Sequence, residues 1–454
     1  MCPDIPVFSL TQTQVPSIIV WVDDSGVAHA RDTKTGNIIA ESSDHASVVQ
    51  AAVNSVGPLG GTVLLRRGTY LIKRPITFAD ETRVRVKGEL GYSHLRSTVL
   101  RVDASFPDQR YVFECVRQST ARYNATIEIE DLHIWNPNWS SVRAGFLLWD
   151  GIIPGTFGGP KIRRCYAHYM WRGIHLRGDA DYGVITDFIY EAPRTDVTVD
   201  AALIAEAYSA TQFTAPFAAH RMIVLIFGTA NNAIRIDGSS FHIRDVFIFG
   251  GTAANNPNNF SDAAIRLGAS LGAWSCYLDG IHISDVSGEQ TALVLDGVDA
   301  SNPLTRNNRI VFTSMVAKYV RFMNNAFNNV VVVRQSPNSV PVIDDAGAGP
   351  GNTVIVEPGS RLWSQSEAGK ITATKCRVVD LRPGASAAGA ATIPAGSTSV
   401  TVNHGLLAAP SKVLVTPAGN LGAVWVESIT STSFTIRCST APAADTVVYW
   451  YAEI

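Results

Sequence analysis

The chain has 454 residues, of which 37 are Lys or Arg and 39 are Asp or Glu. This near balance of charge argues against nucleic acid or an acidic membrane surface as the partner. No stretch approaches eighteen uncharged apolar residues, so membrane insertion is not expected. The length exceeds that of most single domains and predicts one long body with a small appendage.

Residues 1–43 are predicted to form an N-terminal arm of hairpins. Strand-like runs flank a turn with the sequence DDSG, and a second pair flanks the sequence KTGN. The beginning of the arm lacks both a basic leader and a continuous apolar stretch, so it does not resemble a secretory signal. A chain from which a leader has been removed is the alternative.

Residues 44–72 combine a short helix with a glycine-hinged strand. Asp44 can cap the first helical turn, and apolar residues then return at helical spacing. These apolar residues are Val48, Val49, Ala52, Val53 and Val56. Glycine and proline residues between 57 and 61 end the helix, after which apolar residues fall on alternate positions, as in a strand. Such a helix can close the open end of a stack of strands, whose bare edge would invite aggregation.

The order of residues in this stretch, "D…A…QAA…GGTV.L..GTY.I", resembles the start of the pectate-lyase-like superfamily. That superfamily includes polygalacturonase-like hydrolases and many phage tailspikes. The resemblance implies an all-β fold, with a right-handed parallel β-helix over residues 44–382 and an N-terminal capping helix. An ordinary α/β domain is the alternative, and it would need helices between the strands that follow.

Short strand signals recur after this point, and several of them can be superposed. Residues 131–134 (DLHI), 245–248 (DVFI) and 280–283 (GIHI) form one set, and residues 233–236 (AIRI) and 264–267 (AIRL) form another. Such repetition predicts a solenoid with about three strands in each coil. The residues expected to point outward from the first set are His133, Phe247 and His282.

Paired asparagines mark the predicted corners of the solenoid, because asparagine tolerates the left-handed backbone conformation that a tight bend needs. A sandwich would instead predict antiparallel hairpins with two-residue turns. The pairs lie at residues 231–232, 255–256, 307–308, 324–325 and 328–329.

Two further segments differ in composition. Residues 192–220 show no strand alternation and contain a possible short helix at residues 201–208, which suggests a functional lobe or a packing flap. Residues 383–390 are small and suit a linker. Beyond them, residues 391–454 alternate cleanly between Gly, Pro, Asn and Ser turns, which predicts a small C-terminal β-sandwich-like domain.

The six cysteines are widely spaced, without CxxC or CxxH pairs, so they are expected to be mostly free thiols in the core. His133, His175 and His282 each lie between apolar positions and are expected to face outward, but a metal site built from them is not favoured. Clustered acidic ligands for calcium are not evident either. No metal or other cofactor is therefore predicted.

No complete catalytic motif of the polygalacturonase-like hydrolases is present, so only the expected geometry of the fold indicates candidate acids. Glycoside hydrolysis needs two carboxyl groups at ≈ 5–5.5 Å or ≈ 6.5–9.5 Å, and neighbouring rows of a β-helix offer both spacings. Asp179 and Asp181 point to one side of the same segment and are the best local pair, with Asp187, Glu191 and Asp237 as partners from nearby coils. An aspartate that accepts backbone hydrogen bonds in a turn is the competing interpretation for each.

Aromatic residues cluster in the same part of the chain. Flat exposed rings can stack on sugar faces, although buried ring ladders are the usual alternative. The candidate substrate-binding residues are Trp135, Trp139, Trp149, Trp171 and Tyr182.

These patterns lead to a working hypothesis of a tailspike-like protein that binds and cleaves a polysaccharide, with hydrolysis by paired carboxylates favoured. A non-catalytic receptor-binding fibre or adhesin and a polysaccharide lyase or epimerase are the alternatives, because the fold does not choose among them. The resemblance to tailspikes implies a homotrimer, and the C-terminal module looks suited to association. It also implies an extracellular, virion-associated protein, which would need no export leader.

Overall fold

The computed structural model describes residues 16–56, 60–79, 82–89, 97–116, 126–151, 158–178, 180, 182–193, 198–206, 217–250, 260–284, 291–299, 304–314, 319–335, 342–357, 373–382 and 384–454. The chain folds into two compact units, Met1–Gly228 and Thr229–Ile454. No helix in the described part of the chain is long and apolar enough to cross a membrane.

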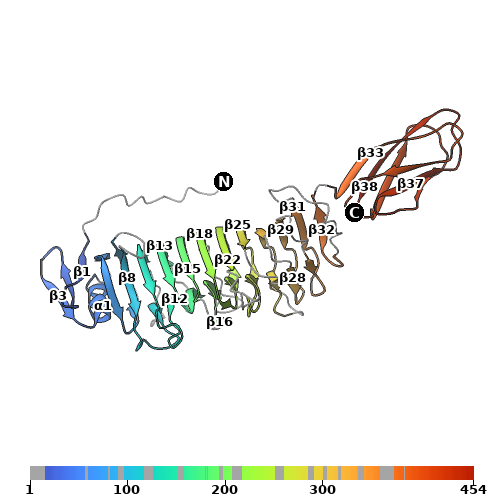
Figure 1. Ribbon diagram of the computed structural model, residues 1–454. Coiled ribbons are helices and arrows are strands. Elements are labelled where there is room, and N and C mark those ends of the chain that lie inside the picture. Colours follow the sequence, from blue (N-terminus) through green and yellow to red (C-terminus); the bar gives the residue numbers. More distant parts are fainter. Residues whose placement is uncertain are drawn as a thin grey trace. The chain divides into compact units, whose positions relative to one another are not determined.

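The first unit consists mainly of parallel strands in two sheets, which we call wall A and wall B (Figure 1). Wall A contains β4 (Gly61–Leu65), β5 (Gly68–Ile72), β7 (Arg83–Gly88), β8 (Thr98–Val102), β10 (Thr126–Glu130), β11 (Leu132–Trp135), β13 (Lys161–His168), β15 (Val184–Glu191) and β18 (Phe217–Ile226). Wall B contains β6 (Ile76–Phe78), β9 (Tyr111–Val116), β12 (Gly145–Gly151), β14 (Arg172–Gly178) and β17 (Leu203–Glu206). The chain alternates between the walls, and successive strands in each wall pair in parallel. This arrangement confirms the predicted all-β fold, a parallel β-helix.

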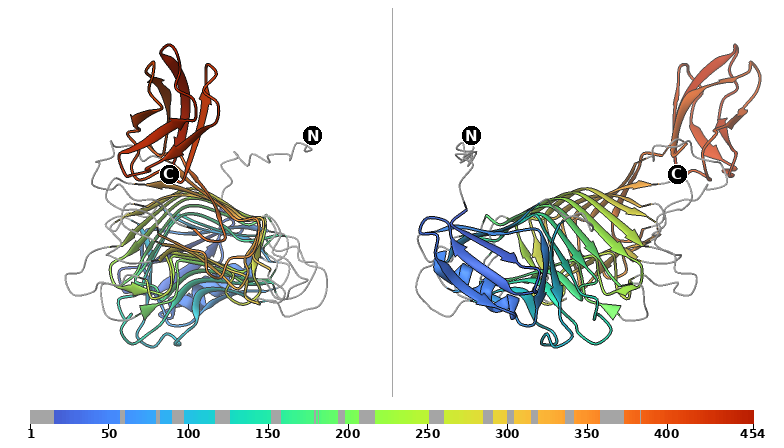
Figure 2. Two further views of the ribbon diagram at one scale, coloured as in Figure 1. Left: turned by 90° about the vertical axis from the view of Figure 1, so that its right-hand side faces the viewer. Right: turned by 60° about the vertical axis from the view of Figure 1, so that its left-hand side comes forward.

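The start of the first unit combines hairpins with a helix. Strands β1 (Ile18–Val22), β2 (Ala28–Asp32) and β3 (Ile38–Ser42) pair antiparallel around the two predicted turns, and β1 also pairs in parallel with β4. Helix α1 (His45–Val56) packs against these first strands, as Figure 2 shows. The apolar stripe read from the sequence is the buried face of α1. The His45 side chain contacts two other segments, because it bonds Gly26 O through Nε2 and accepts a hydrogen bond from Leu71 N at Nδ1, both at 2.9 Å.

A column of residues with positive φ marks a bend in wall A. Asp131, Arg164, Asp187 and Arg221 have φ between 50° and 57°. Asp131 lies between β10 and β11, and the other three follow one another on β13, β15 and β18. The charges alternate, and each arginine donates two hydrogen bonds to an aspartate: Arg164 Nε lies 2.6 Å from Asp131, and Arg221 Nε lies 2.6 Å from Asp187. Paired guanidinium and carboxylate groups thus accompany a backbone conformation that is uncommon for side chains other than Asn and Asp.

The second unit repeats this architecture. One sheet contains β22 (Phe241–Gly250), β25 (Tyr277–Ser284), β27 (Arg309–Ser314), β29 (Val330–Gln335), β31 (Thr353–Glu357) and β32 (Arg377–Asp380). The other contains β20 (Ile234–Ile236), β23 (Ile265–Leu267), β26 (Thr291–Asp296), β28 (Tyr319–Met323) and β30 (Val342–Asp344). Very short strands are β16 (Thr198–Val199) in the first unit, and β19 (Thr229–Ala230), β21 (Gly238–Ser239) and β24 (Ala273–Trp274) in the second.

Three of the predicted asparagine corners have left-handed backbone in the second unit, whereas neither residue of the pair at 231–232 has a positive φ. Asn307, Asn324, Asn325 and Asn328 have positive φ. Next to them runs a buried ladder in which Asn308 Nδ2 donates to Asn329 Oδ1 and Asn329 Nδ2 donates to Asn352 Oδ1, each at 3.0 Å. These asparagines are at most 1% exposed. The pair at residues 255–256 lies outside the described residues.

The second unit ends in two antiparallel three-stranded sheets. The first has the order β33 (Ser386–Ile393), β38 (Thr446–Glu453) and β35 (Lys412–Pro417). The second has the order β34 (Ser399–Asn403), β37 (Ser433–Cys438) and β36 (Val424–Glu427). We call this part the C-terminal module. It has a core of its own, which includes Ile393, Phe434, Ile436 and Val448, all fully buried.

The prediction of a possible short helix at residues 201–208 is wrong. Residues 203–206 form strand β17, which pairs with β14 in wall B. Ala201, Ala202, Leu203 and Ala205 are fully buried. Burial of both faces removed the alternation that marks a half-exposed strand, and a short apolar run of this kind cannot be told from a helix by its periodicity.

Candidate functional site

The outer face of wall B in the first unit carries a row of charged side chains. Ile174 and Leu176 of β14 are fully buried, so the alternation of a strand places His175 and Arg177 on the opposite face. Arg177 lies beside Asp150 of β12 on one side and beside Glu206 of β17 on the other. Three neighbouring strands of wall B therefore place Asp150, Arg177 and Glu206 side by side in one row.

A chain of hydrogen bonds leads to Glu206. Arg172 Nη1 lies 3.0 Å from Tyr111 Oη, Tyr111 Oη lies 2.6 Å from His175 Nδ1, and His175 Nε2 lies 3.0 Å from Glu206 Oε2. Arginine can only donate, so the tyrosine oxygen accepts from it and its own proton can go to Nδ1. His175 then carries its proton on Nε2 and donates it to Glu206. All donors in the chain point towards that carboxylate.

Ion pairs connect this chain to neighbouring carboxylates. Arg172 Nε lies 2.6 Å from Asp200 Oδ2. Arg177 lies between two acids, with Nη1 at 3.2 Å from Asp150 Oδ2 and Nε at 3.9 Å from Glu206 Oε2. Asp150 is 8% exposed and the Glu206 side chain is 31% exposed, so Glu206 is the more open of the two acids.

Burial sets the protonation of the neutral members. Tyr111 is 4% exposed and His175 is 5% exposed. Removal from water disfavours the charged form of each, which raises the pKa of Tyr111 to about 12 and lowers the pKa of His175 below its usual value. Both side chains are therefore neutral at pH 7, as the direction of the hydrogen-bond chain requires.

Trp171 borders this network, as one of the predicted substrate-binding residues. The Arg172 guanidinium lies 3.9 Å from the centre of its ring, and Arg143 lies at 5.8 Å. Asp179 and Asp181, the favoured catalytic pair, follow β14 but lie outside the described residues. Their catalytic role stays a prediction.

Asp187 belongs to the column of positive φ in wall A and not to wall B. The Arg221 guanidinium donates to both of its oxygens and holds the pKa of Asp187 below its usual range. This pairing accompanies the bend in wall A, and a catalytic role for Asp187 stays a prediction.

Glu191 and Trp135 lie on the same row of wall A, with His168 between them. Glu191 is 8% exposed and accepts a hydrogen bond from the Tyr166 hydroxyl. The ring of Trp135 has His168 at 6.3 Å, in a stacked geometry, and the Arg101 guanidinium at 5.6 Å. The two predicted residues are therefore close to each other, but protein groups already contact the ring that was expected to stack on sugar.

Two of the expected site residues are buried in contacts within the protein. Asp237 is 1% exposed, and one of its oxygens accepts hydrogen bonds from the backbone N–H groups of residues 269–272, as in the competing interpretation for a turn. Trp149 is 1% exposed and points into the core of the first unit, so it offers no face to a ligand. Trp139 lies partly exposed in the turn after β11, and Tyr182 is 62% exposed before β15.

The expected outward residues differ in exposure. Phe247 is 37% exposed and stacks on His282 at 5.0 Å. His133 is 3% exposed, because its ring stacks on Tyr166 and His168. Cys115, Cys165, Cys276, Cys376 and Cys438 are free thiols, as expected. Among the described residues, no group of three or more His, Cys, Asp or Glu side chains is arranged to hold a metal ion.

Comparison with known proteins finds similarity in fold only. No family model matches the chain, and no curated protein is similar to it in sequence. ORF18 of Geobacillus virus E2 is 13% identical over 74% of this chain and 68% of its own, with a TM-score of 0.37. The tailspike gp49 of Pseudomonas phage LKA1 is 11% identical over 90% of this chain and 92% of its own, with a TM-score of 0.31. The tailspike gp49 of Acinetobacter baumannii bacteriophage Fri1, a capsular polysaccharide depolymerase, is 10% identical over 89% and 82%, with a TM-score of 0.32.

Proposed function

We propose that this protein binds a polysaccharide along wall B of the first unit and hydrolyses it with Asp150 and Glu206. The supporting observation is the row in which these two carboxylates flank Arg177 on consecutive strands. Strands that are two apart in a sheet lie roughly 9.6 Å from each other, which is close to the upper end of the carboxyl spacing of inverting glycosidases. Inversion leaves room for a water molecule between the sugar and the base.

The surroundings of the two acids suggest how the roles divide. His175 donates a hydrogen bond to Glu206, and the more exposed Glu206 side chain is better placed to activate water, so we assign it as the general base. Asp150 is assigned as the general acid, because its burial favours the protonated form against the opposing effect of Arg177, whose Nη1 lies 3.2 Å from Oδ2. Trp171 lies at the edge of the same network and would contact the sugar chain beside the reacting residue.

Elimination is less well supported than hydrolysis. A lyase that acts on a uronate needs a cation to neutralise the sugar carboxylate as the proton leaves. The described arginines on wall B already pair with carboxylates of the protein: Arg110 with Glu114, Arg172 with Asp200, and Arg177 with Asp150. Carboxylates of the protein therefore already balance most of the positive charge of these arginines.

A reducing-end assay on a panel of neutral and acidic bacterial polysaccharides tests the proposal, with the absorbance of unsaturated uronates read in parallel. New reducing ends without that absorbance are the expected result. Both signals together would indicate a lyase, and neither signal with any substrate that the protein binds would indicate an adhesin.

The tailspike-like assembly is a second part of the proposal. The sequence resemblance to phage tailspikes supports a homotrimer that is carried on a virion and acts outside the cell. Sedimentation equilibrium of the full chain should give three times the monomer mass of 48.8 kDa. A monomeric mass at micromolar concentration would remove the trimer from the account.

A further inference from the structure

Cationic side chains gather on the outer face of wall A, at its first strands. Val84 and Val86 of β7 are buried, so the alternation of the strand places Arg83, Arg85 and Lys87 on the outward face. Residues two apart on such a strand are separated by roughly 6.6 Å, so the three cations form a line along β7. This line contains none of the residues assigned to hydrolysis on wall B.

Two cations hold the acid next to this line. Glu128 of β10 lies beside Arg85 in the strand register and is 8% exposed. It accepts a hydrogen bond from Arg85 Nε at 2.7 Å and another from Lys161 Nζ at 3.2 Å. Burial alone would raise the pKa of Glu128, but the hydrogen bonds and charges of these two cations lower it below its usual value. The acid is therefore ionised at pH 7, and its two cationic partners more than balance its charge.

A small cavity opens on this face beside Arg83. Its volume is about 150 Å³, which exceeds the ≈ 10–15 Å³ needed to hold one water molecule and is below the ≈ 300 Å³ at which sites for drug-sized ligands begin. Gly60 borders the cavity with φ of 84°, and a Cβ at this position would lie 3.3 Å from Arg83 O. The cavity therefore suits one compact group. The lining residues with polar side chains are Thr62, Arg83, Arg85, Thr126 and Glu128.

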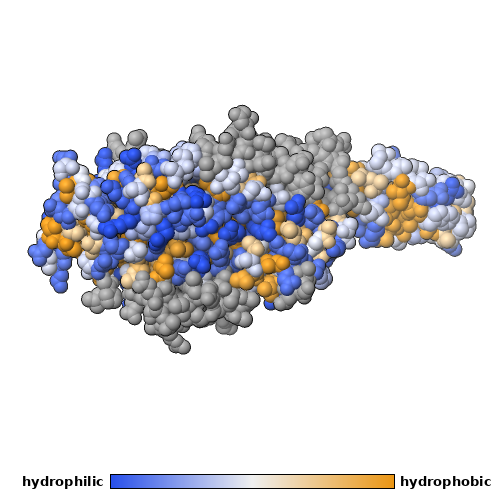
Figure 3. Space-filling model, turned by 90° about the horizontal axis from the view of Figure 1, so that it is seen from below, coloured by the Kyte–Doolittle hydropathy of each residue, from blue (hydrophilic) through white to orange (hydrophobic). Residues whose placement is uncertain are grey.

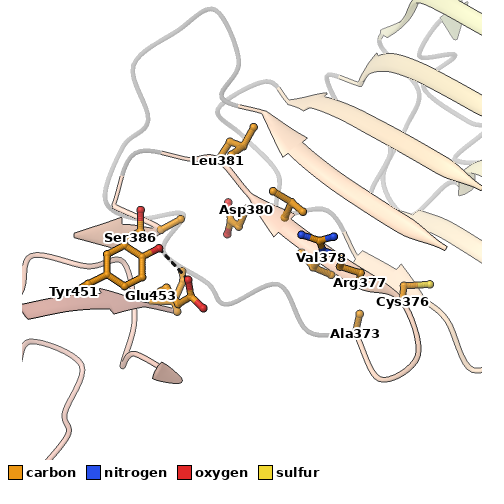
Figure 4. Close-up of a pocket in the computed structure, with 12 residues that line it drawn as sticks. Ala373, Cys376, Arg377, Val378, Asp380, Leu381, Ser386, Tyr451 and Glu453 are labelled. Atoms are coloured by element: carbon orange, nitrogen blue, oxygen red, sulfur yellow. Dashed lines mark hydrogen bonds between the residues drawn. The ribbon is translucent and has the colours of Figure 1, made fainter. Parts of the chain in front are cut away.

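The balance of charge distinguishes this cavity from the rest of the surface. Hydrophilic residues cover much of the face that Figure 3 shows, so polarity alone does not mark a site. The described residues that line the larger cavity beside β32 and β38, of about 650 Å³, include two acids, Asp380 and Glu453, against one cation, Arg377 (Figure 4). The described lining of the cavity beside Arg83 has the opposite balance, with two arginines against the single acid Glu128.

We propose that the cavity beside Arg83 binds a phosphate group. Arginine presents its N–H donors in a planar fork that matches two phosphate oxygens, and the hydroxyls of Thr62 and Thr126 can donate to others. Arg85 Nε and Nη2 both bond Glu128 at 2.7 Å, so Arg83 supplies the main charge for the ligand. Among the described residues, no carboxylate pairs with Arg83, which is exposed.

Free phosphate and the phosphate of a lipid headgroup would present the same oxygens to this cavity. Inorganic phosphate and glycerol 3-phosphate are therefore the two probes, because the second carries its phosphate as a headgroup does. Acetate is the third probe. It is also an anion, but it has two oxygens and one charge, so it can use fewer of the donors.

Isothermal titration calorimetry of the full chain with these probes, at constant ionic strength, tests the site. The variants are Arg83→Gln, which removes the charge, and Thr126→Val, which removes a lining hydroxyl and keeps the shape. Arg244→Gln is the matched control, because Arg244 is an exposed arginine of β22 in the second unit. We expect saturable binding of phosphate to the wild type, weakened about tenfold or more in Arg83→Gln and about threefold in Thr126→Val, and unchanged in the control.

Three results overturn the proposal: no saturable heat from either phosphate probe in the wild type, equal phosphate affinity of Arg83→Gln and the wild type, or acetate bound as tightly as phosphate. If Arg83→Gln does not fold, Thr126→Val decides, and wild-type affinity in that variant overturns the proposal. Binding of both phosphate probes supports a carried phosphate as the ligand, and binding of inorganic phosphate alone supports the free anion. The proposal is independent of hydrolysis, because reducing-end release reports on wall B and calorimetry with phosphate reports on wall A.

Discussion

Replacing Tyr111 with phenylalanine should weaken wall B locally while leaving the aromatic ring in place. The ring packs over Gly145, where even a methyl group would lie 2.2 Å from Tyr111 Cδ1, so a phenylalanine ring can keep the same position. The hydroxyl bonds Arg172 at 3.0 Å and His175 at 2.6 Å. The Arg172 side chain is 22% exposed and can turn to water, whereas His175 is 5% exposed and would lose its partner at Nδ1.

Leaving one buried polar atom unsatisfied, together with the loss of a second hydrogen bond, costs about 2 kcal/mol. Native-state hydrogen exchange should report this as amides of β14 that exchange about 30-fold faster in Tyr111→Phe. Tyr182→Phe is the control, because the Tyr182 side chain is 62% exposed, and its amides should exchange as in the wild type. Equal exchange in both variants would show that the Tyr111 hydroxyl does not bridge Arg172 and His175, which would refute the hydrogen-bond chain.

Three further outcomes are expected. Burial lowers the pKa of His175, so the unfolded chain binds a proton there more readily than the folded protein does. The free energy of unfolding should therefore fall as the pH drops below 6.5 through the folded pKa. Urea titrations should show this fall in the wild type and a smaller fall in His175→Gln. Asn329→Ala should destabilise the second unit by about 3 kcal/mol in the same titrations, because Asn329 is fully buried and forms hydrogen bonds with two other asparagines. Arg334→Ala is the control. It removes an exposed ion pair and should cost less than about 1 kcal/mol. Trp171→Ala should raise KM for a cleaved polysaccharide about tenfold and change kcat little, and an unchanged KM would exclude Trp171 from substrate binding.

Local repetition made the fold predictable from the sequence. The superposed residues 245–248 and 280–283 are paired in the structure, with Phe247 beside His282, and residues 233–236 and 264–267 pair with Arg235 beside Arg266. In a parallel solenoid, similar short sequences occupy equivalent positions on successive coils. Aligning these short repeated sequences with one another therefore also gives the register of the paired strands.

The site was harder to predict because its residues come from strands whose register the sequence does not show. Asp150 and Glu206 are 56 residues apart, since they lie on strands separated by one further strand of the same wall. The sequence does not mark Glu206 as a site residue, because residues 201–208 also suit a short helix. A usable signal was present in β14, where the alternation in GIHLRG places His175 and Arg177 on one outward face.

Several predicted site residues are engaged in contacts that the sequence does not show, and these cases share a physical cause. Spacing along one strand shows that a side chain faces outward, but not which groups of neighbouring strands it meets. The sequence predicts Asp187 as a candidate acid, and in the structure Arg221 pairs with it. Asp237 is occupied by backbone N–H groups, and Trp149 lies in the core. Each of these outcomes depends on residues at least 30 positions away in the sequence, or on which face of the strand points into the core.

Reducing-end release by two variants of wall B tests the central claim most directly. With a polysaccharide that the wild type cleaves, Asp150→Asn and Glu206→Gln should each lower kcat by at least about 100-fold, because each removes one member of the acid and base pair. Asp108→Asn is the matched control, because this carboxylate also pairs with an arginine of the first unit but lies outside the row, and it should retain wild-type rates. Rates within about twofold of the wild type in either wall B variant would contradict the assignment of Asp150 and Glu206 as the hydrolytic pair.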